Sequence, residues 1–105
     1  MPENKVKVAL VQHPPVFVNL PKTLEKVEAL AQECAGNGAN IIVFPETWAA
    51  GYPVWLDEAP QAALWDYAPA KRLYQYLTEN SLQIPGAEFE ILREIARQNS
   101  VYLII

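Results

Sequence analysis

The sequence predicts an α/β fold in which parallel strands alternate with helices. Two apolar segments at residues 5–12 and 41–44 flank a stretch with helical periodicity at residues 20–35. A strand, a helix and a second apolar strand form a right-handed βαβ unit, whose two strands are parallel. A further apolar segment at residues 101–105 follows two more helical patterns. These observations predict parallel βαβ units with helices packed on the sheet.

The first strand, residues 5–12, is followed by a helix with recognisable ends. The strand begins with alternation and becomes continuously apolar, which suits a sheet covered on both faces, and Pro14 and Pro15 stop it. Asn19 is the expected N-cap of the helix, and Gly36-Asn37-Gly38 end it because both residue types accept left-handed backbone angles. The apolar stripe of this helix consists of Leu20, Leu24, Val27, Ala31 and Cys34.

The segment after the second strand is irregular and aromatic. Residues 45–69 contain four prolines and three tryptophans, so we do not expect one regular element there. A long aromatic loop in a compact domain is more often functional than idle. Two helices should follow, with the stripes Ala70, Leu73 and Leu77, and Phe89, Leu92, Ile95 and Ala96, separated by a turn at Pro85-Gly86.

Composition narrows the function classes. A chain of 105 residues with 51% apolar and 19% charged residues is an ordered domain rather than a disordered segment. A net charge of −4 argues against nucleic-acid binding, and one His with one Cys excludes a His-rich metal site and an internal disulfide. The apolar run at residues 8–11 is too short for a signal peptide or a membrane span. We therefore expect a cytoplasmic protein without membrane or nucleic-acid partners.

The sequence stops inside its last apolar strand. A complete domain seldom ends on aggregation-prone residues, and three parallel strands leave sheet edges open. We expect residues 1–105 to be the first part of a longer protein. A natural short chain that pairs with a partner is the alternative.

Glu46 is the best candidate for a chemical role. It follows the second strand directly, after Phe44 and Pro45, and sites in open parallel sheets gather beyond the carboxyl ends of strands. Apolar neighbours would partly desolvate the carboxylate and suit it to act as a general base. The alternative is a solvated or helix-capping glutamate.

Other reactive residue types carry weaker signals. Cys34 lies on the apolar stripe of a helix and is expected to be an inert core thiol. His13, in a turn before two prolines, is expected to be polar surface. Tyr52, with Trp48 and Trp55, either lines an apolar pocket or packs the loop onto the domain.

Two motifs resemble a known family. Val43-Phe-Pro-Glu-Thr-Trp48, followed by Gly51-Tyr-Pro-Val-Trp55, resembles the nitrilase branch of the carbon–nitrogen hydrolase superfamily. The first and last strands also look like N-terminal strands of that family, so the resemblance runs in order over essentially the whole chain. Phe-Pro-Glu alone marks the superfamily, and the Gly-Tyr-Pro motif with Trp55 points to nitrilases rather than to amidases or carbamoylases.

The resemblance implies a fold and an activity. The fold would be an αββα sandwich, of which residues 1–105 form a partial carbon–nitrogen hydrolase domain, its N-terminal portion without the downstream catalytic segments. Glu46 would be the general base of a Glu-Lys-Cys set, and Tyr52 would contact the substrate. A Cys thiolate would attack an organic nitrile and form a thioimidate, which water resolves into ammonia and a carboxylic acid. No metal or organic cofactor is expected, and the full-length form would be a homo-oligomer.

The catalytic Lys and Cys of the family lie downstream of the Glu, and neither Lys71 nor Cys34 matches their motifs. This chain alone is therefore expected to be inactive, because a base without an activated nucleophile cannot carry out covalent catalysis. Two alternatives stay open: a sister amidase or cyanide-converting enzyme, and a non-catalytic interaction fragment.

Overall fold

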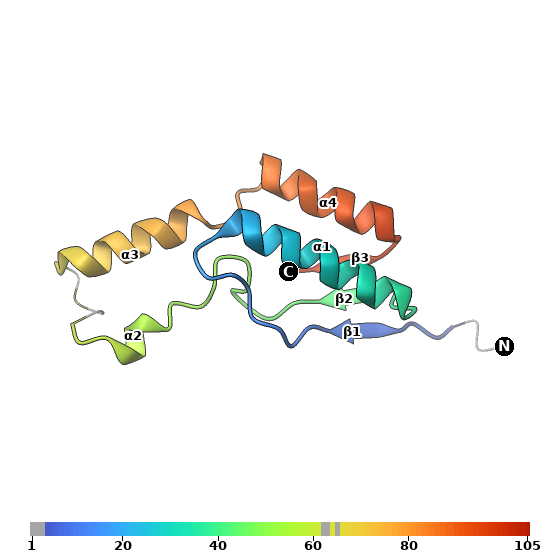
Figure 1. The fold of residues 1–105 in the computed structure, drawn as a ribbon, viewed down its shortest axis with the longest axis horizontal. Helices are drawn as coiled ribbons and strands as arrows, with labels where there is room; N and C mark the ends of the chain where they lie inside the picture. Colours follow the sequence, from blue (N-terminus) through green and yellow to red (C-terminus); the bar gives the residue numbers. More distant parts are fainter. Residues whose placement is uncertain (1–3, 62–63, 65) are drawn as a thin grey trace.

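The structure is a computed structural model and describes residues 4–61, 64 and 66–105. Three short strands, β1 (Val8–Leu10), β2 (Ile41–Val43) and β3 (Tyr102–Ile104), form one sheet in the order β1-β2-β3 (Figure 1). Both strand pairs are parallel. The predicted α/β fold with parallel βαβ units is thus confirmed, although each strand is shorter than the apolar segment that predicted it.

Helix α1 (Leu20–Gly36) has the predicted ends. The Asn19 side chain accepts a 3.2 Å hydrogen bond from the backbone N–H of Lys22, which satisfies one of the donors that an α-helix leaves free in its first turn. Beyond the helix, Gly38 has a φ of +91°, a left-handed conformation that glycine adopts without steric cost. These two local signals fix where the helix begins and where the chain turns toward β2.

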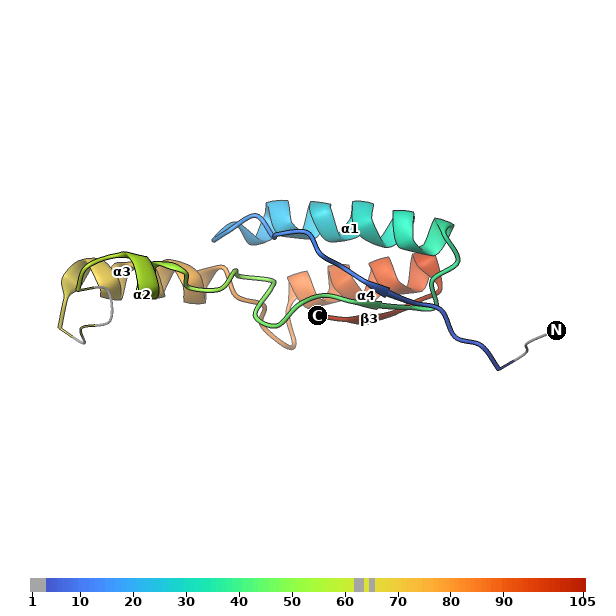
Figure 2. The ribbon, with the colours of Figure 1, turned by 90° about the horizontal axis from the view of Figure 1, so that it is seen from below.

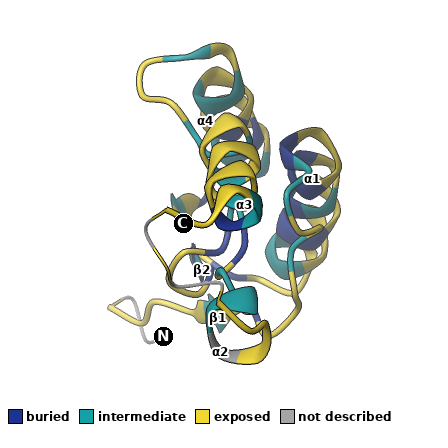
Figure 3. Ribbon diagram, turned by 90° about the vertical axis from the view of Figure 1, so that its left-hand side faces the viewer, coloured by how far each residue is buried: buried dark blue, intermediate teal, exposed yellow. Residues whose placement is uncertain are grey.

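Helix α4 (Ala87–Asn99) packs beside α1 on the same face of the sheet (Figure 2). Both crossovers are expected to be right-handed and the strands are added in one direction, so the two helices must lie on one side. The core between helices and sheet is the dark blue zone of Figure 3. Its least exposed members include Val27, Ala31, Ile42, Leu92 and Ile95.

The opposite face of the sheet is apolar and largely open to solvent. Its register brings Leu10, Val43 and Ile104 side by side. Leu10 is 72% exposed and Tyr102 is 77% exposed, although both belong to strands. The second sheet of an αββα sandwich would cover such a face, and that part of the fold stays a prediction.

A long arm leaves the carboxyl edge of the sheet. It contains α2 (Trp55–Glu58) and α3 (Ala68–Glu79), and it gives the molecule extents of 60 × 27 × 19 Å (Figure 1). The segment at residues 45–69 is not one regular element, as predicted; Trp65, one of its three tryptophans, lies outside the described residues. In the described part of the chain, the helices are too short or too polar to cross a membrane.

Candidate active site

Two loops lie side by side at the carboxyl edge of the sheet. The loop after β1, residues 11–19, and the loop after β2, residues 44–54, are joined by two hydrogen bonds. The indole N–H of Trp48 donates to the carbonyl of His13 at 2.7 Å, and the backbone N–H of Val18 donates to the carbonyl of Ala50 at 3.1 Å. Parallel α/β proteins bind ligands beyond the carboxyl ends of their strands, so these two loops are where an active site is expected.

Glu46 occupies the tip of a short turn that two aromatic residues close. Phe44 and Trp48 are each only 4% exposed, and their ring centroids lie 4.6 Å apart at an interplanar angle of 51°. The backbone N–H of Phe44 donates to the carbonyl of Ile104 at 2.8 Å, which ties the turn to β3. We call residues 44–48, with this aromatic pair at the base and Glu46 at the tip, the clasped turn.

The Glu46 side chain itself is exposed. The described residues therefore do not supply the partial desolvation that its apolar sequence neighbours predicted, because Phe44 and Trp48 turn inward while the tip points away from the core. An exposed carboxylate at a strand end remains able to accept a proton from a group brought to it. The role of Glu46 as a general base stays a prediction.

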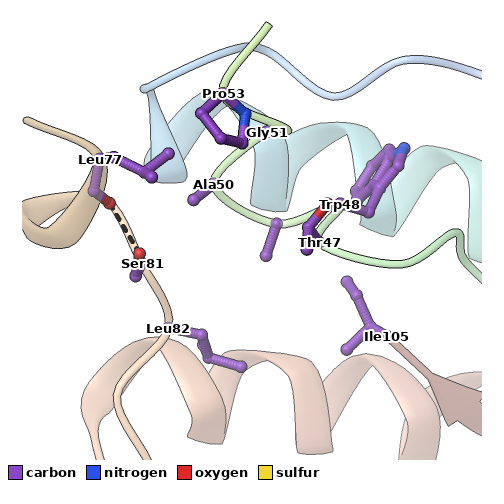
Figure 4. Close-up of a pocket in the computed structure, with 10 residues that line it drawn as sticks. Thr47, Trp48, Ala50, Gly51, Pro53, Leu77, Ser81, Leu82 and Ile105 are labelled. Carbon is purple, nitrogen blue, oxygen red and sulfur yellow. Dashed lines mark hydrogen bonds between the residues drawn. The ribbon is translucent and has the colours of Figure 1, made fainter. Parts of the chain in front are cut away.

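An apolar pocket of about 330 Å³ begins at the next residue, Thr47 (Figure 4). Its lining residues are Thr47, Trp48, Ala49, Ala50, Gly51, Pro53, Leu77, Ser81, Leu82 and Ile105. Both hydroxyl groups of the lining already donate to backbone carbonyls, Thr47 to Glu46 at 2.7 Å and Ser81 to Leu77 at 2.6 Å. The pocket therefore offers a mainly apolar surface beside the clasped turn.

Tyr52 lies between two lining residues of this pocket, Gly51 and Pro53, but is 53% exposed and does not line the pocket. Trp55 also lies away from it, in edge-to-face contact with Tyr74 at 6.1 Å between ring centroids. The predicted contact of Tyr52 with substrate therefore stays a prediction.

Cys34 sits at the other end of the sheet from Glu46. Helix α1 starts at the carboxyl edge and runs back to the amino edge, and the 14 helical steps from Leu20 to Cys34 span about 21 Å. There the carbonyl of Cys34 accepts a hydrogen bond from Ala39 just before β2 begins. Cys34 is half-buried against the core, and desolvation, followed by the charge of Glu33, raises the pKa of its thiol. Cys34 is therefore not suited to be the nucleophile that Glu46 activates, because it lies at the opposite edge of the sheet and its raised pKa disfavours the thiolate.

Lys71 is equally unsuited to a site at the clasped turn. It lies on the exposed arm and forms a 3.6 Å ion pair with Asp66. Among residues 4–61, 64 and 66–105, no three His, Cys, Asp or Glu side chains gather in a way that would hold a metal ion.

Sequence reasoning missed the part that His13 plays. Its side chain is exposed, in line with the expected polar surface, but its backbone carbonyl anchors Trp48 from 35 residues away. Backbone groups carry no residue-specific signal, so nothing in the sequence pointed to this bond.

Comparison with known proteins supports the resemblance. The sequence profile described as "Carbon-nitrogen hydrolase" matches residues 7–105. An arylacetonitrilase of Hypocrea virens is 36% identical over 101 residues, which cover 96% of this chain and 28% of that protein. A nitrilase of Pseudomonas syringae pv. syringae is 35% identical over 102 residues, covering 95% and 28% of the two chains. A cyanide hydratase of Microdochium sorghi is 32% identical over 105 residues, covering 100% and 27%.

This chain thus spans a little more than a quarter of the length of these curated relatives. The profile match nevertheless covers nearly all of its residues, including both loops at the carboxyl edge. The chain belongs to the carbon–nitrogen hydrolase family, on its nitrilase branch.

Proposed function

We propose that residues 1–105 form the base-bearing part of a hydrolase that converts organic nitriles to carboxylic acids and ammonia. The observation that carries the proposal is the clasped turn: a carboxylate held at the carboxyl edge of a parallel sheet, next to an apolar pocket. Relatives named as nitrilases and arylacetonitrilases match the chain over this region. Below, the complete enzyme means a polypeptide of the relatives' length that contains these residues.

In this proposal Glu46 accepts the proton of a thiol as the sulfur attacks the nitrile carbon. The proton then passes to the nitrile nitrogen, and the product is a covalent thioimidate. One water releases ammonia and leaves a thioester, and a second water releases the acid, so each nitrile consumes two waters. The attacking thiol lies outside residues 1–105, because Cys34 is their only cysteine and stands at the wrong edge of the sheet.

The same proposal covers the setting of the enzyme. A Lys outside residues 1–105 would stabilise the charged intermediates, Tyr52 would contact the substrate, and neither a metal nor an organic cofactor would be required. The complete enzyme would be a cytoplasmic homo-oligomer whose organic substrate is a small nitrile. Residues 1–105 alone would be inactive.

A comparison of four proteins tests the proposal: the complete enzyme, its Glu46→Gln and Glu28→Gln variants, and residues 1–105 alone. We expect nitrile turnover by the complete enzyme and by Glu28→Gln, whose exposed carboxylate lies on α1. Glu46→Gln should lower turnover by about 10²–10⁴-fold, the usual contribution of a general base, with unchanged circular dichroism. Near-normal rates for Glu46→Gln, or turnover by residues 1–105 alone, would refute it.

A sister activity is the second candidate, since a cyanide hydratase matches the chain over its whole length. The same assay with amides and cyanide in place of nitriles separates the two candidates. Turnover of amide or cyanide without nitrile turnover would replace the first proposal with the second.

A further inference from the structure

We propose that Trp48 is the positioning residue of Glu46, holding the clasped turn so that the carboxylate meets the reacting group in one geometry. The inference rests on the proposed function of Glu46 and goes beyond it by assigning a positioning role to a buried residue that also lines the neighbouring pocket. Trp48 would act on the carboxylate through its contacts with His13 and Phe44, which hold the turn.

Two buried anchors bracket Glu46 symmetrically. Phe44, two residues before it, is bonded to the last residue of β3, Ile104. Trp48, two residues after it, is bonded to His13 in the loop after β1. The two anchors also contact each other at 4.6 Å, so the turn is closed at its base by an aromatic pair.

The bond to His13 is the contact that fixes the orientation of the second anchor. An indole has a single donor, and here it forms a 2.7 Å bond in a place where Trp48 is only 4% exposed. The tilted contact with Phe44 is less directional than a short hydrogen bond, so the N–H···O bond adds the orientation that ring contact alone does not fix. The bond therefore couples the turn that carries Glu46 to the neighbouring loop.

The backbone between the anchors is held under strain. Thr47 has a φ of +55°, a left-handed conformation that is unfavourable for a β-branched residue. Its hydroxyl donates to the carbonyl of Glu46 at 2.7 Å, which supports this conformation locally. Such strain persists only where surrounding contacts hold it, and Trp48 is the buried contact on that side.

A general base depends on this kind of placement. Proton transfer requires the acceptor within hydrogen-bond reach of its donor, and a displacement of about 1 Å costs on the order of 10²-fold in rate. Since the Glu46 side chain is exposed, the clasped turn is what limits its range of positions.

The first test compares Trp48→Phe with Trp55→Phe in the complete enzyme. Trp48→Phe keeps an aromatic ring on Phe44 and removes the N–H that holds His13. Trp55→Phe makes the same change where the indole N–H has no hydrogen-bond partner in the part of the chain that the structure describes. We expect Trp48→Phe to lower kcat by about 10-fold or more with KM for the nitrile within about twofold, and Trp55→Phe to change neither by more than about twofold.

A double-mutant cycle separates positioning from a general structural defect. If Trp48 acts through Glu46, the kcat loss caused by Trp48→Phe should shrink to about twofold or less in a Glu46→Asp background, whose shorter carboxylate is already misplaced. Equal losses in both backgrounds would overturn the proposal. A wild-type kcat for Trp48→Phe would also overturn the positioning role of Trp48. The proposed function would survive that result as long as Glu46→Gln is inactive.

Thr47→Gly is a second variant that loosens the clasped turn, for use if Trp48→Phe does not fold. Thr47 is exposed, and glycine adopts a φ of +55° without strain, so this variant should fold with unchanged or higher stability. It nevertheless removes the hydroxyl bond to Glu46 and frees the tip of the turn. We expect kcat to fall by about 10-fold at constant KM; a wild-type kcat would show that the conformation of the clasped turn does not position Glu46, and would overturn a role for Trp48 that acts through this turn.

Discussion

The ring of Phe17 occupies the space that any side chain on Gly51 would need. A Cβ built on Gly51 would lie 2.5 Å from Cδ1 of Phe17 and 3.1 Å from its Cε1. Gly51 also has a φ of +95°, so both its backbone and its surroundings require glycine. This contact adds packing to the two hydrogen bonds that join the loops at the carboxyl edge.

Gly51→Ala should therefore destabilise the fold at this edge. The added methyl group must displace an aromatic ring and adopt a left-handed backbone, and together these effects should lower the free energy of unfolding by about 2–4 kcal/mol. Chemical denaturation followed by circular dichroism would measure the change.

Gly36→Ala is the matched control. A Cβ at this last residue of α1 would have nothing within 4 Å. The substitution should raise the free energy of unfolding by up to about 1 kcal/mol, because alanine favours the helix. Equal effects of the two substitutions would show that the ring of Phe17 moves freely and that the loops are not packed together.

Much of the fold follows from local sequence signals. The apolar stripe and the ends of α1 are fixed by residues close in sequence, such as Asn19 and Gly38, and the parallel sheet follows from the βαβ order. The sequence left a solvated Glu46 open as the alternative and could not decide for it, because its exposure depends on how Phe44 and Trp48 turn inward as a pair. The Trp48–His13 bond joins residues 35 apart through a backbone carbonyl, which no sequence pattern marks.

Thr23 gives a second test of how the loop after β1 is held. Its side chain is 0% exposed, and its hydroxyl donates to the Val16 carbonyl at 2.9 Å and accepts from the Val16 N–H at 3.0 Å. Thr23→Val keeps the shape and leaves the Val16 N–H without this acceptor, so the free energy of unfolding should fall by about 1–3 kcal/mol.

Thr78→Val provides the comparison for that measurement. The Thr78 hydroxyl also bonds a backbone carbonyl, that of Tyr74 at 2.8 Å, but on the exposed surface of α3. Water can replace this bond, so the change should stay within about 0.5 kcal/mol. If Thr78→Val lowered the free energy of unfolding as much as Thr23→Val, burial of the hydroxyl would not determine how much its removal destabilises the fold.

The thiol of Cys34 should be slow to react in the folded chain. Desolvation and then the charge of Glu33 raise its pKa, so the thiolate forms at higher pH than in the unfolded chain. Between neutral pH and the pKa of the unfolded thiol, iodoacetamide should modify the native chain more slowly than the same chain in denaturant. The difference between the two modification rates should shrink as the pH rises through the pKa of Cys34 in the folded chain. Faster modification of the native chain at neutral pH would indicate an activated thiol and reopen its candidacy as nucleophile.

The uncovered sheet face should make residues 1–105 self-associate. Leu10 and Ile104 are 72% and 54% exposed and flank Val43 in register, which gives a continuous apolar strip. A Leu10→Lys/Ile104→Lys double variant should raise the monomer fraction in sedimentation velocity. Ile91→Lys, which alters a 47% exposed side chain on α4, should not. A parent chain that is monomeric throughout the micromolar range would contradict the expectation.

In the complete enzyme, the same double variant should destabilise the fold. If a second sheet covers this face, as the αββα sandwich requires, the lysines would be buried without partners and would lower the free energy of unfolding by several kcal/mol. Ile91→Lys would again serve as the surface control, since α4 turns that side chain outward. A complete enzyme that tolerates both lysines without loss of stability would show that the face stays open to solvent and that the sandwich does not form on it.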